Sequence, residues 1–250
     1  MMKQNDSGNM MSRRIDARTR LMLALDVPTA AAADELLERV GDHIHIIKIG
    51  LELFTAEGPR MVHRVLSGGK KVFLDLKFLD IDETVKRATA TVAGMGVQFL
   101  TVHARGKTLK AAVEGRGNQR SLKILGVTVL TSQNVQDLRE SGSTWSVEDL
   151  VIARAQLASM LGCDGVVASG RESGIIRHAI GPGMSIVTPG VRQINKGVDD
   201  HARATTPGQA IEAGADYLVV GRPIRDAQDP IVAIEEIVAE MQTAFDARIE

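Results

Sequence analysis

Cysteine is almost absent from this chain of 250 residues, and Cys163 is its only example. A disulfide within the chain is therefore excluded, and this usage predicts a protein of the reducing cytoplasm. Aromatic residues make up 3% of the sequence, so few side chains are available on which nucleic-acid bases could stack. The formal net charge of −1 offers no basic stripe, and we expect no nucleic-acid partner.

Long apolar runs are lacking as well. No stretch approaches the roughly 20 apolar residues that a membrane-spanning helix needs, so we expect no membrane partner. Residues 1–18 are polar and have no continuous apolar core, which argues against a secretory signal. We predict a disordered tail over residues 1–18 and a single catalytic domain over residues 19–250.

From residue 20 onward, short apolar runs alternate with amphipathic stretches. The runs with the length and composition of strands are Leu21–Leu25, His45–Ile49, Lys71–Leu76, Val97–Val102, Leu122–Val129, Gly165–Ala168, Met184–Val187 and Tyr217–Val220. The stretches that resemble helices are Ala30–Val40, Ile81–Ala93, Thr108–Glu114, Val147–Leu161, Pro207–Ala213 and Pro230–Phe245. Residues that can cap a helix precede four of them, namely Thr29, Asp80, Ser146 and Thr206.

This alternation predicts the fold class. Strands that are apolar throughout and separated by helices are typical of a parallel sheet that helices cover. Eight such units in about 230 residues match the size of a (β/α)8 TIM barrel. An open, doubly wound sheet is the alternative, but no G-x-G-x-x-G motif follows the first strand. We therefore predict an α/β protein with a (β/α)8 barrel.

One predicted strand carries an unusual pair of charges. Asp75 and Lys77 are two residues apart, so in a strand they point to the same side, and Asp80 follows just past the expected strand end. Removing such charges from water is unfavourable unless something compensates. A structural ion pair at a sheet edge is one interpretation. A lysine held cationic by carboxylates at the mouth of a cavity is the other.

The ends of the other strands favour the second interpretation. In (β/α)8 barrels the active site lies at the carboxyl-terminal ends of the strands. Polar or glycine residues stand at most of these ends: Asp26, Lys48, His103, Thr131-Ser132, Thr188-Pro189-Gly190 and Gly221-Arg222. Because all of them converge on one rim, we predict an active site there. We interpret His103 as a structural residue, and we find no cluster with the spacing of metal ligands.

With these residues in place, the chain resembles the orotidine 5′-phosphate decarboxylase family. The similarity runs in order from about residue 20 to residue 240. The segment Asp75-Leu76-Lys77-Phe78-Leu79-Asp80-Ile81 is similar to the D-x-K-x-x-D signature, which the wider phosphosugar decarboxylase suprafamily shares. The other matching segments are Leu25-Asp26-Val27-Pro28, Ile47-Lys48-Ile49-Gly50-Leu51-Glu52-Leu53-Phe54, Leu100-Thr101-Val102-His103-Ala104, Val127-Thr128-Val129-Leu130-Thr131-Ser132, Thr188-Pro189-Gly190-Val191-Arg192 and Val219-Val220-Gly221-Arg222-Pro223-Ile224.

The resemblance implies a reaction and its catalytic residues. The implied reaction is the decarboxylation of orotidine 5′-phosphate (OMP) to UMP in pyrimidine biosynthesis, without metal or cofactor. Lys77 would protonate C6 of the pyrimidine, and Asp75, Asp80 and Lys48 would complete the charged array around it. In the family, the residue that corresponds to Asp80 comes from the neighbouring subunit. The resemblance therefore implies a homodimer with shared active sites.

The resemblance also implies residues that bind the substrate. Asp26 would hold a ribose hydroxyl, Thr131 and Ser132 the pyrimidine edge, and Arg192, Gly221 and Arg222 the phosphate. The chain departs from the family pattern in two places. Asp82-Glu83 replaces a Pro-Asn pair ahead of Thr84, which we also expect to bind substrate, and His201 stands where the family has a phosphate-binding glutamine.

Two other functions are compatible with the barrel. A magnesium-dependent 3-keto-gulonate-phosphate decarboxylase would use the same aspartates around a metal ion, but such enzymes lack the Thr131-Ser132 and Thr188–Arg192 context. A barrel that only binds phosphate ligands would not need the set of Asp75, Lys77 and Asp80. Activity in the presence of EDTA would distinguish the predicted metal-free decarboxylase from the magnesium-dependent enzyme. Turnover of substrate would distinguish it from a barrel that only binds phosphate ligands.

Overall fold

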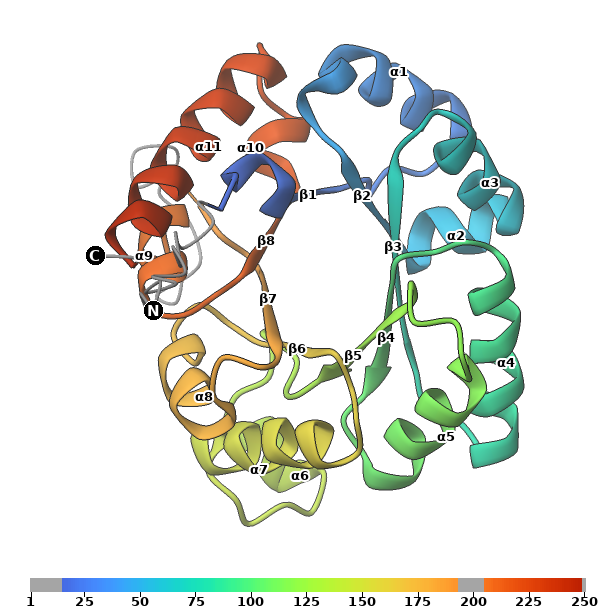
Figure 1. Cartoon of the computed structure of the whole chain (residues 1–250), viewed down its shortest axis with the longest axis vertical. Coiled ribbons are helices and arrows are strands. Elements are labelled where there is room, and N and C mark those ends of the chain that lie inside the picture. The colour runs from blue at the N-terminus through green and yellow to red at the C-terminus, as the bar shows by residue number, and fades with distance from the viewer. Residues whose placement is uncertain (1–14, 193–204, 249–250) are drawn as a thin grey trace, which may run out of the picture.

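The computed structural model describes residues 15–192 and 205–248. Eight parallel strands form a closed barrel in chain order, and β8 pairs with β1 to complete it (Figure 1). The strands are β1 (Leu21–Ala24), β2 (Ile46–Gly50), β3 (Lys71–Phe78), β4 (Phe99–His103), β5 (Lys123–Val127), β6 (Gly165–Val167), β7 (Ser185–Pro189) and β8 (Tyr217–Val220). The predicted (β/α)8 barrel and all eight predicted strands are confirmed.

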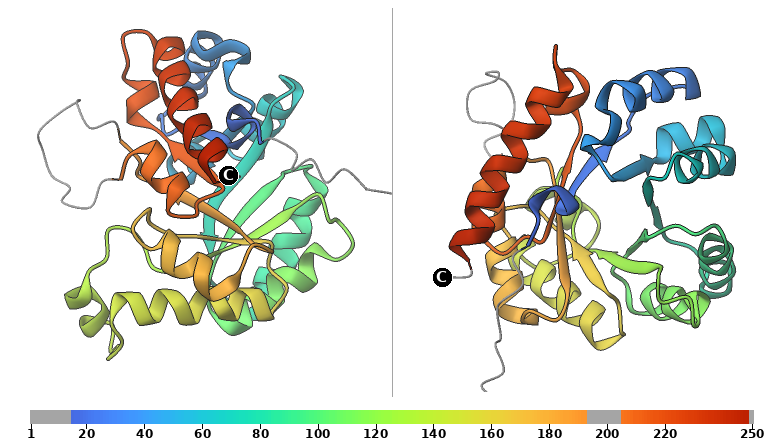
Figure 2. Two further views of the ribbon diagram at one scale, coloured as in Figure 1. Left: turned by 60° about the vertical axis from the view of Figure 1, so that its left-hand side comes forward. Right: turned by 45° about the horizontal axis from the view of Figure 1, so that its top comes forward.

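Helices surround the barrel as an outer ring, and the long C-terminal helix α11 closes the ring beside α1 (Figures 1 and 2). The α-helices are α1 (Ala30–Val40), α2 (Leu51–Glu57), α3 (Pro59–Ser67), α4 (Asp82–Gly94), α5 (Gly106–Arg116), α6 (Val135–Glu140), α7 (Val147–Met160), α8 (Ser173–Ile180), α9 (Pro207–Glu212), α10 (Arg222–Arg225) and α11 (Pro230–Ala247). Two 3-10 helices are η1 (Ala17–Arg20) and η2 (Gly41–His43). No helix among the described residues is long and apolar enough to cross a membrane.

Three of the four predicted caps are confirmed. The hydroxyl groups of Thr29, Ser146 and Thr206 accept backbone N–H groups at the starts of α1, α7 and α9. Asp80 is not the cap of α4, because Ile81 occupies that position and the Asp80 carboxylate accepts the Ile81 N–H at 2.6 Å. The helices α2, α3, α6, α8 and α10 were not predicted. They have four to nine residues, too few for a clear helical repeat of apolar positions.

The last residues of the predicted tail, from Ile15 onward, are packed against the barrel domain. Residues 1–14 lie outside the described part of the chain. From Ile15 onward the chain packs against α11: Ala17 is buried and its N–H donates to Gln242 at 3.0 Å, while Arg18 pairs with Glu235 at 2.7 Å.

The core has two layers. The larger layer fills the space between the strands and the helix ring, and the smaller one lies inside the barrel. Inside, Phe99 makes edge-to-face contacts with Phe73 and Tyr217, at centroid distances of 6.0 and 5.4 Å. Since side chains alternate along a strand, the next inward positions toward the carboxyl ends of β2, β3 and β4 are Lys48, Asp75 and Thr101. An apolar layer thus supports a polar layer at the rim.

Candidate active site

Four charged side chains form a row across the ends of three adjacent strands. The Lys48 ammonium donates to Asp26 Oδ1 at 2.8 Å and lies 3.8 Å from Asp75 Oδ2. The Lys77 ammonium donates to Asp75 Oδ1 at 2.9 Å. Asp75 keeps only 15% of its side-chain surface exposed, and it is compensated by two cations. The alternation of sign along Asp26, Lys48, Asp75 and Lys77 gives each charge an opposite partner, which offsets the cost of burying Lys48 and Asp75.

Lys77 has an unusual backbone. Its φ is +50°, the only positive value among the described residues other than glycine, and such conformations are unfavourable by about 1–3 kcal/mol. The strand is bulged at this point, because β3 advances four residues from Leu74 to Phe78 while β4 advances two, from Leu100 to Val102. The Lys77 ammonium nevertheless lies 2.9 Å from Asp75 Oδ1, so the two side chains point the same way. The prediction that Asp75 and Lys77 share one side is therefore confirmed, although the strand between them is not regular.

Thr101 contacts both of these residues, although no role for it was predicted from the sequence. It is fully buried, accepts the Lys77 N–H at 2.9 Å and donates to Asp75 Oδ1 at 2.8 Å. A hydroxyl at an inward position of an otherwise apolar strand was the available signal.

A cavity of about 560 Å³ opens at the carboxyl ends of the strands opposite this row. Four of the predicted binding residues line it: Thr131, Ser132, Arg192 and Arg222. Gly221 directly precedes Arg222, and a β-carbon there would lie 3.3 Å from the β-carbon of Ala24. A side chain at position 221 would therefore crowd β1.

The remaining predicted residues lie elsewhere. Asp80 and Thr84 are exposed, and neither contacts the charged row of its own chain in any described interaction. Asp82 and Glu83 occupy the first turn of α4, where negative charge is favourable next to the helix N-terminus. That placement gives the departure from the family's Pro-Asn pair a structural role. His201 lies outside the described residues.

Burial shifts the pKa values of His103 and Cys163 toward the neutral forms of these groups. Burial, with contributions from Arg105, Arg154 and Lys77, lowers the pKa of His103. His103 is therefore neutral at physiological pH and adds no positive charge beside Lys77. Burial, reinforced by Asp164, raises the pKa of the Cys163 thiol to about 12, so this thiol is unreactive.

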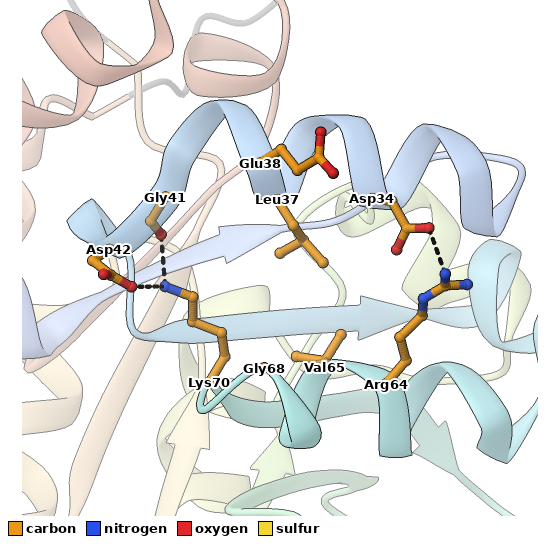
Figure 3. A pocket seen from close by; sticks show the side chains of 9 residues that line it. All are labelled: Asp34, Leu37, Glu38, Gly41, Asp42, Arg64, Val65, Gly68 and Lys70. Atoms are coloured by element: carbon orange, nitrogen blue, oxygen red, sulfur yellow. Dashed lines mark hydrogen bonds and ion pairs between the residues drawn. The ribbon is translucent and has the colours of Figure 1, made fainter.

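A second cavity of about 430 Å³ lies outside the barrel between α1 and α3 (Figure 3). Each of its cations is paired: Lys70 donates to the Gly41 carbonyl at 2.6 Å and to Asp42 at 3.1 Å, and Arg64 pairs with Asp34 at 2.9 Å. It lies away from the rim residues and offers no cation free to hold an anionic ligand. Among the described residues, no group of three or more His, Cys, Asp or Glu side chains is arranged to hold a metal ion.

Known proteins resemble the chain over nearly its whole length. The profile of the orotidine 5′-phosphate decarboxylase / HUMPS family matches residues 19–237. The orotidine 5′-phosphate decarboxylase of Bradyrhizobium diazoefficiens is 48% identical over 233 residues, which cover 93% of this chain and 98% of that protein. The enzyme of the same name from Rhodopseudomonas palustris is 46% identical, over 92% of this chain and 97% of that protein.

Similarity to a solved structure agrees with these matches. The crystal structure of orotidine 5′-phosphate decarboxylase from Lactobacillus acidophilus superposes with a TM-score of 0.79 at 33% sequence identity. The superposition covers 89% of this chain and 99% of that one. The barrel fold is thus shared with a protein of this name.

Proposed function

The chain belongs to the orotidine 5′-phosphate decarboxylase / HUMPS family and is an orotidine 5′-phosphate decarboxylase, and we propose that Lys77 is its proton donor. In this mechanism the bond between C6 and the carboxylate breaks and carbon dioxide leaves. The electron pair remains on C6, and the Lys77 ammonium transfers a proton to form the C6–H bond of UMP. A cation beside a developing carbanion both stabilises it and protonates it.

The row of alternating charges carries this proposal. Asp75 lies between two ammonium groups and accepts a hydrogen bond from the Lys77 ammonium at 2.9 Å, which fixes the position of the proposed proton donor. Lys48 forms a longer ion pair with the other Asp75 oxygen, at 3.8 Å, and donates a hydrogen bond to Asp26 at 2.8 Å. Asp26 keeps 44% of its side-chain surface exposed, so it can accept a ribose hydroxyl while it holds Lys48.

The cavity supports the proposed placement of the rest of the substrate. Its volume of about 560 Å³ suits a mononucleotide. Thr131 and Ser132 are proposed to hydrogen-bond the pyrimidine edge. Arg222 and Arg192 are proposed to hold the phosphate, for which a guanidinium offers two parallel donors. The neighbouring Gly221 is proposed to let the phosphate approach the backbone.

We further propose a homodimer in which Asp80 completes the partner's charged row. Its carboxylate is exposed and lies outside the row of its own chain. The residues on either side of it, Leu79 and Ile81, are exposed by 47% and 75%, and exposed apolar side chains around a charged residue favour a protein interface. Thr84 lies one helical turn further on and is proposed to reach substrate from the same surface. In this dimer each subunit presents the same patch to the other.

The proposed reaction needs no metal, and turnover in EDTA tests this. Each of the two carboxylates in the row is paired with a lysine, and among the described residues no group of three or more His, Cys, Asp or Glu side chains is arranged to hold a metal ion. We expect purified protein treated with EDTA to convert OMP at the same rate as untreated protein, followed by the loss of OMP absorbance. Loss of activity in EDTA and its recovery with magnesium would instead favour the chemistry of the 3-keto-gulonate-phosphate decarboxylases.

Phosphate binding is expected to be separable from the chemical step. Arg222→Ala should raise KM and lower kcat/KM for OMP by about 10- to 100-fold, because a hydrogen bond to a charged group is lost. Orotidine, which lacks the phosphate, should react poorly with the wild type and equally poorly with the variant. Arg120→Ala is the matched control, since Arg120 is exposed in the loop before β5, away from the cavity. Equal fractional losses for OMP and orotidine in Arg222→Ala would contradict a phosphate contact.

A further inference from the structure

One buried hydroxyl joins the two central members of the charged row. Thr101 lies on β4 beside the bulge of β3, and no part of it is exposed to solvent. A backbone N–H can only donate, so the Thr101 oxygen accepts from Lys77 N at 2.9 Å. The single hydroxyl proton is then free to go to Asp75 Oδ1, at 2.8 Å. The direction of both hydrogen bonds is fixed by their partners.

These two bonds constrain the groups that are proposed to react. Asp75 Oδ1 receives both the Thr101 hydroxyl and the Lys77 ammonium, while Oδ2 faces Lys48. The Thr101 bond therefore sets the rotation of the carboxylate that the two lysines share. The other bond ties down the Lys77 backbone where φ is +50°, a conformation that lysine does not favour by itself. The direction of the Lys77 side chain depends on that backbone.

We propose that Thr101 is a positioning residue for the decarboxylation, acting through both Asp75 and Lys77. This inference rests on the proposed role of Lys77 as proton donor. The competing explanation is that Thr101 only fills space in the barrel. Valine has nearly the same shape as threonine but lacks the hydroxyl, so the two explanations predict different behaviour for Thr101→Val.

The test compares Thr101→Val with Thr101→Ser. We expect Thr101→Val to lower kcat by about 10- to 100-fold, the loss typical of a hydrogen bond to a charged group. KM for OMP should stay within about threefold, because the lining of the substrate cavity is unchanged. Serine keeps the hydroxyl, so Thr101→Ser should restore kcat to within about threefold of the wild type. If Thr101→Val does not fold, Thr101→Ala removes the same hydroxyl with no added bulk, and the same loss of kcat is expected.

Thr89→Val is the matched control. Thr89 is another fully buried threonine, on α4, and its hydroxyl has no hydrogen-bond partner among the described residues. This variant should keep the wild-type kcat. Wild-type kcat in Thr101→Val, or equal losses in Thr101→Val and Thr101→Ser, would overturn the positioning role. The Lys77→Ala variant shows whether the positioning role of Thr101 or the proposed function itself has failed. If Lys77→Ala is inactive while Thr101→Val is fully active, only the inference about Thr101 is wrong.

Discussion

Replacement of Lys77 by alanine is expected to abolish turnover and to leave the barrel folded. We expect kcat to fall by at least about 10⁴-fold, because general acid catalysis and electrostatic stabilisation of the carbanion are lost together. Such a loss corresponds to about 5.5 kcal/mol of activation free energy. The fold should persist because Lys77 is part of the polar rim and not of the apolar core.

The measurement is single-turnover conversion of OMP, with the free energy of unfolding in urea as the test of folding. Lys71→Ala is the matched control, since Lys71 is an exposed lysine at the start of the same strand and far from the rim. It should keep wild-type activity. A Lys77→Ala variant with a tenth of wild-type activity would remove Lys77 from the donor role, because that loss is only about 1.4 kcal/mol.

The second large effect is recovery of activity in mixed dimers. Lys77→Ala and Asp80→Ala should each be defective as homodimers, because every site lacks one essential group. In a hybrid dimer whose Asp80 residues reach across the interface, one site has both groups intact and the other has neither. Random mixing of equal amounts makes about half of the dimers hybrid, each with one of two sites restored. Activity should therefore rise to about one quarter of the wild type, as follows from two-fold symmetry.

A mixture of Lys77→Ala with Asp75→Ala is the matched control for this experiment. Asp75 and Lys77 form their ion pair within one chain, so no site in such a hybrid has both residues intact. This mixture should recover no activity. If the mixture with Asp80→Ala also recovers none, although subunit exchange is demonstrated by labelled chains, then Asp80 does not serve the partner's site and the shared-site proposal is wrong.

Much of the barrel could be predicted from the sequence because the relevant signals are local. A run such as Ile46–Gly50 is recognisable as a buried strand from its own residues, and a threonine such as Thr29 caps its helix through an N–H three residues away. Short helices such as α10 were missed because four residues give no periodic pattern. The convergence of the strand ends on one rim followed from the fold class, since parallel strands in a barrel all end on the same face.

The sequence by itself thus determined the eight strands, the rim and the residue types on it. Tertiary structure decided which of these side chains touch. The link from Asp26 to Lys48 depends on the register of β1 and β2, and the link from Thr101 to Asp75 and Lys77 depends on a bulge between β3 and β4. Thr131 and Arg222 meet at one cavity only because the barrel closes. Contacts of this kind are set by the packing of segments that are distant in the chain, and no local pattern of residues encodes them.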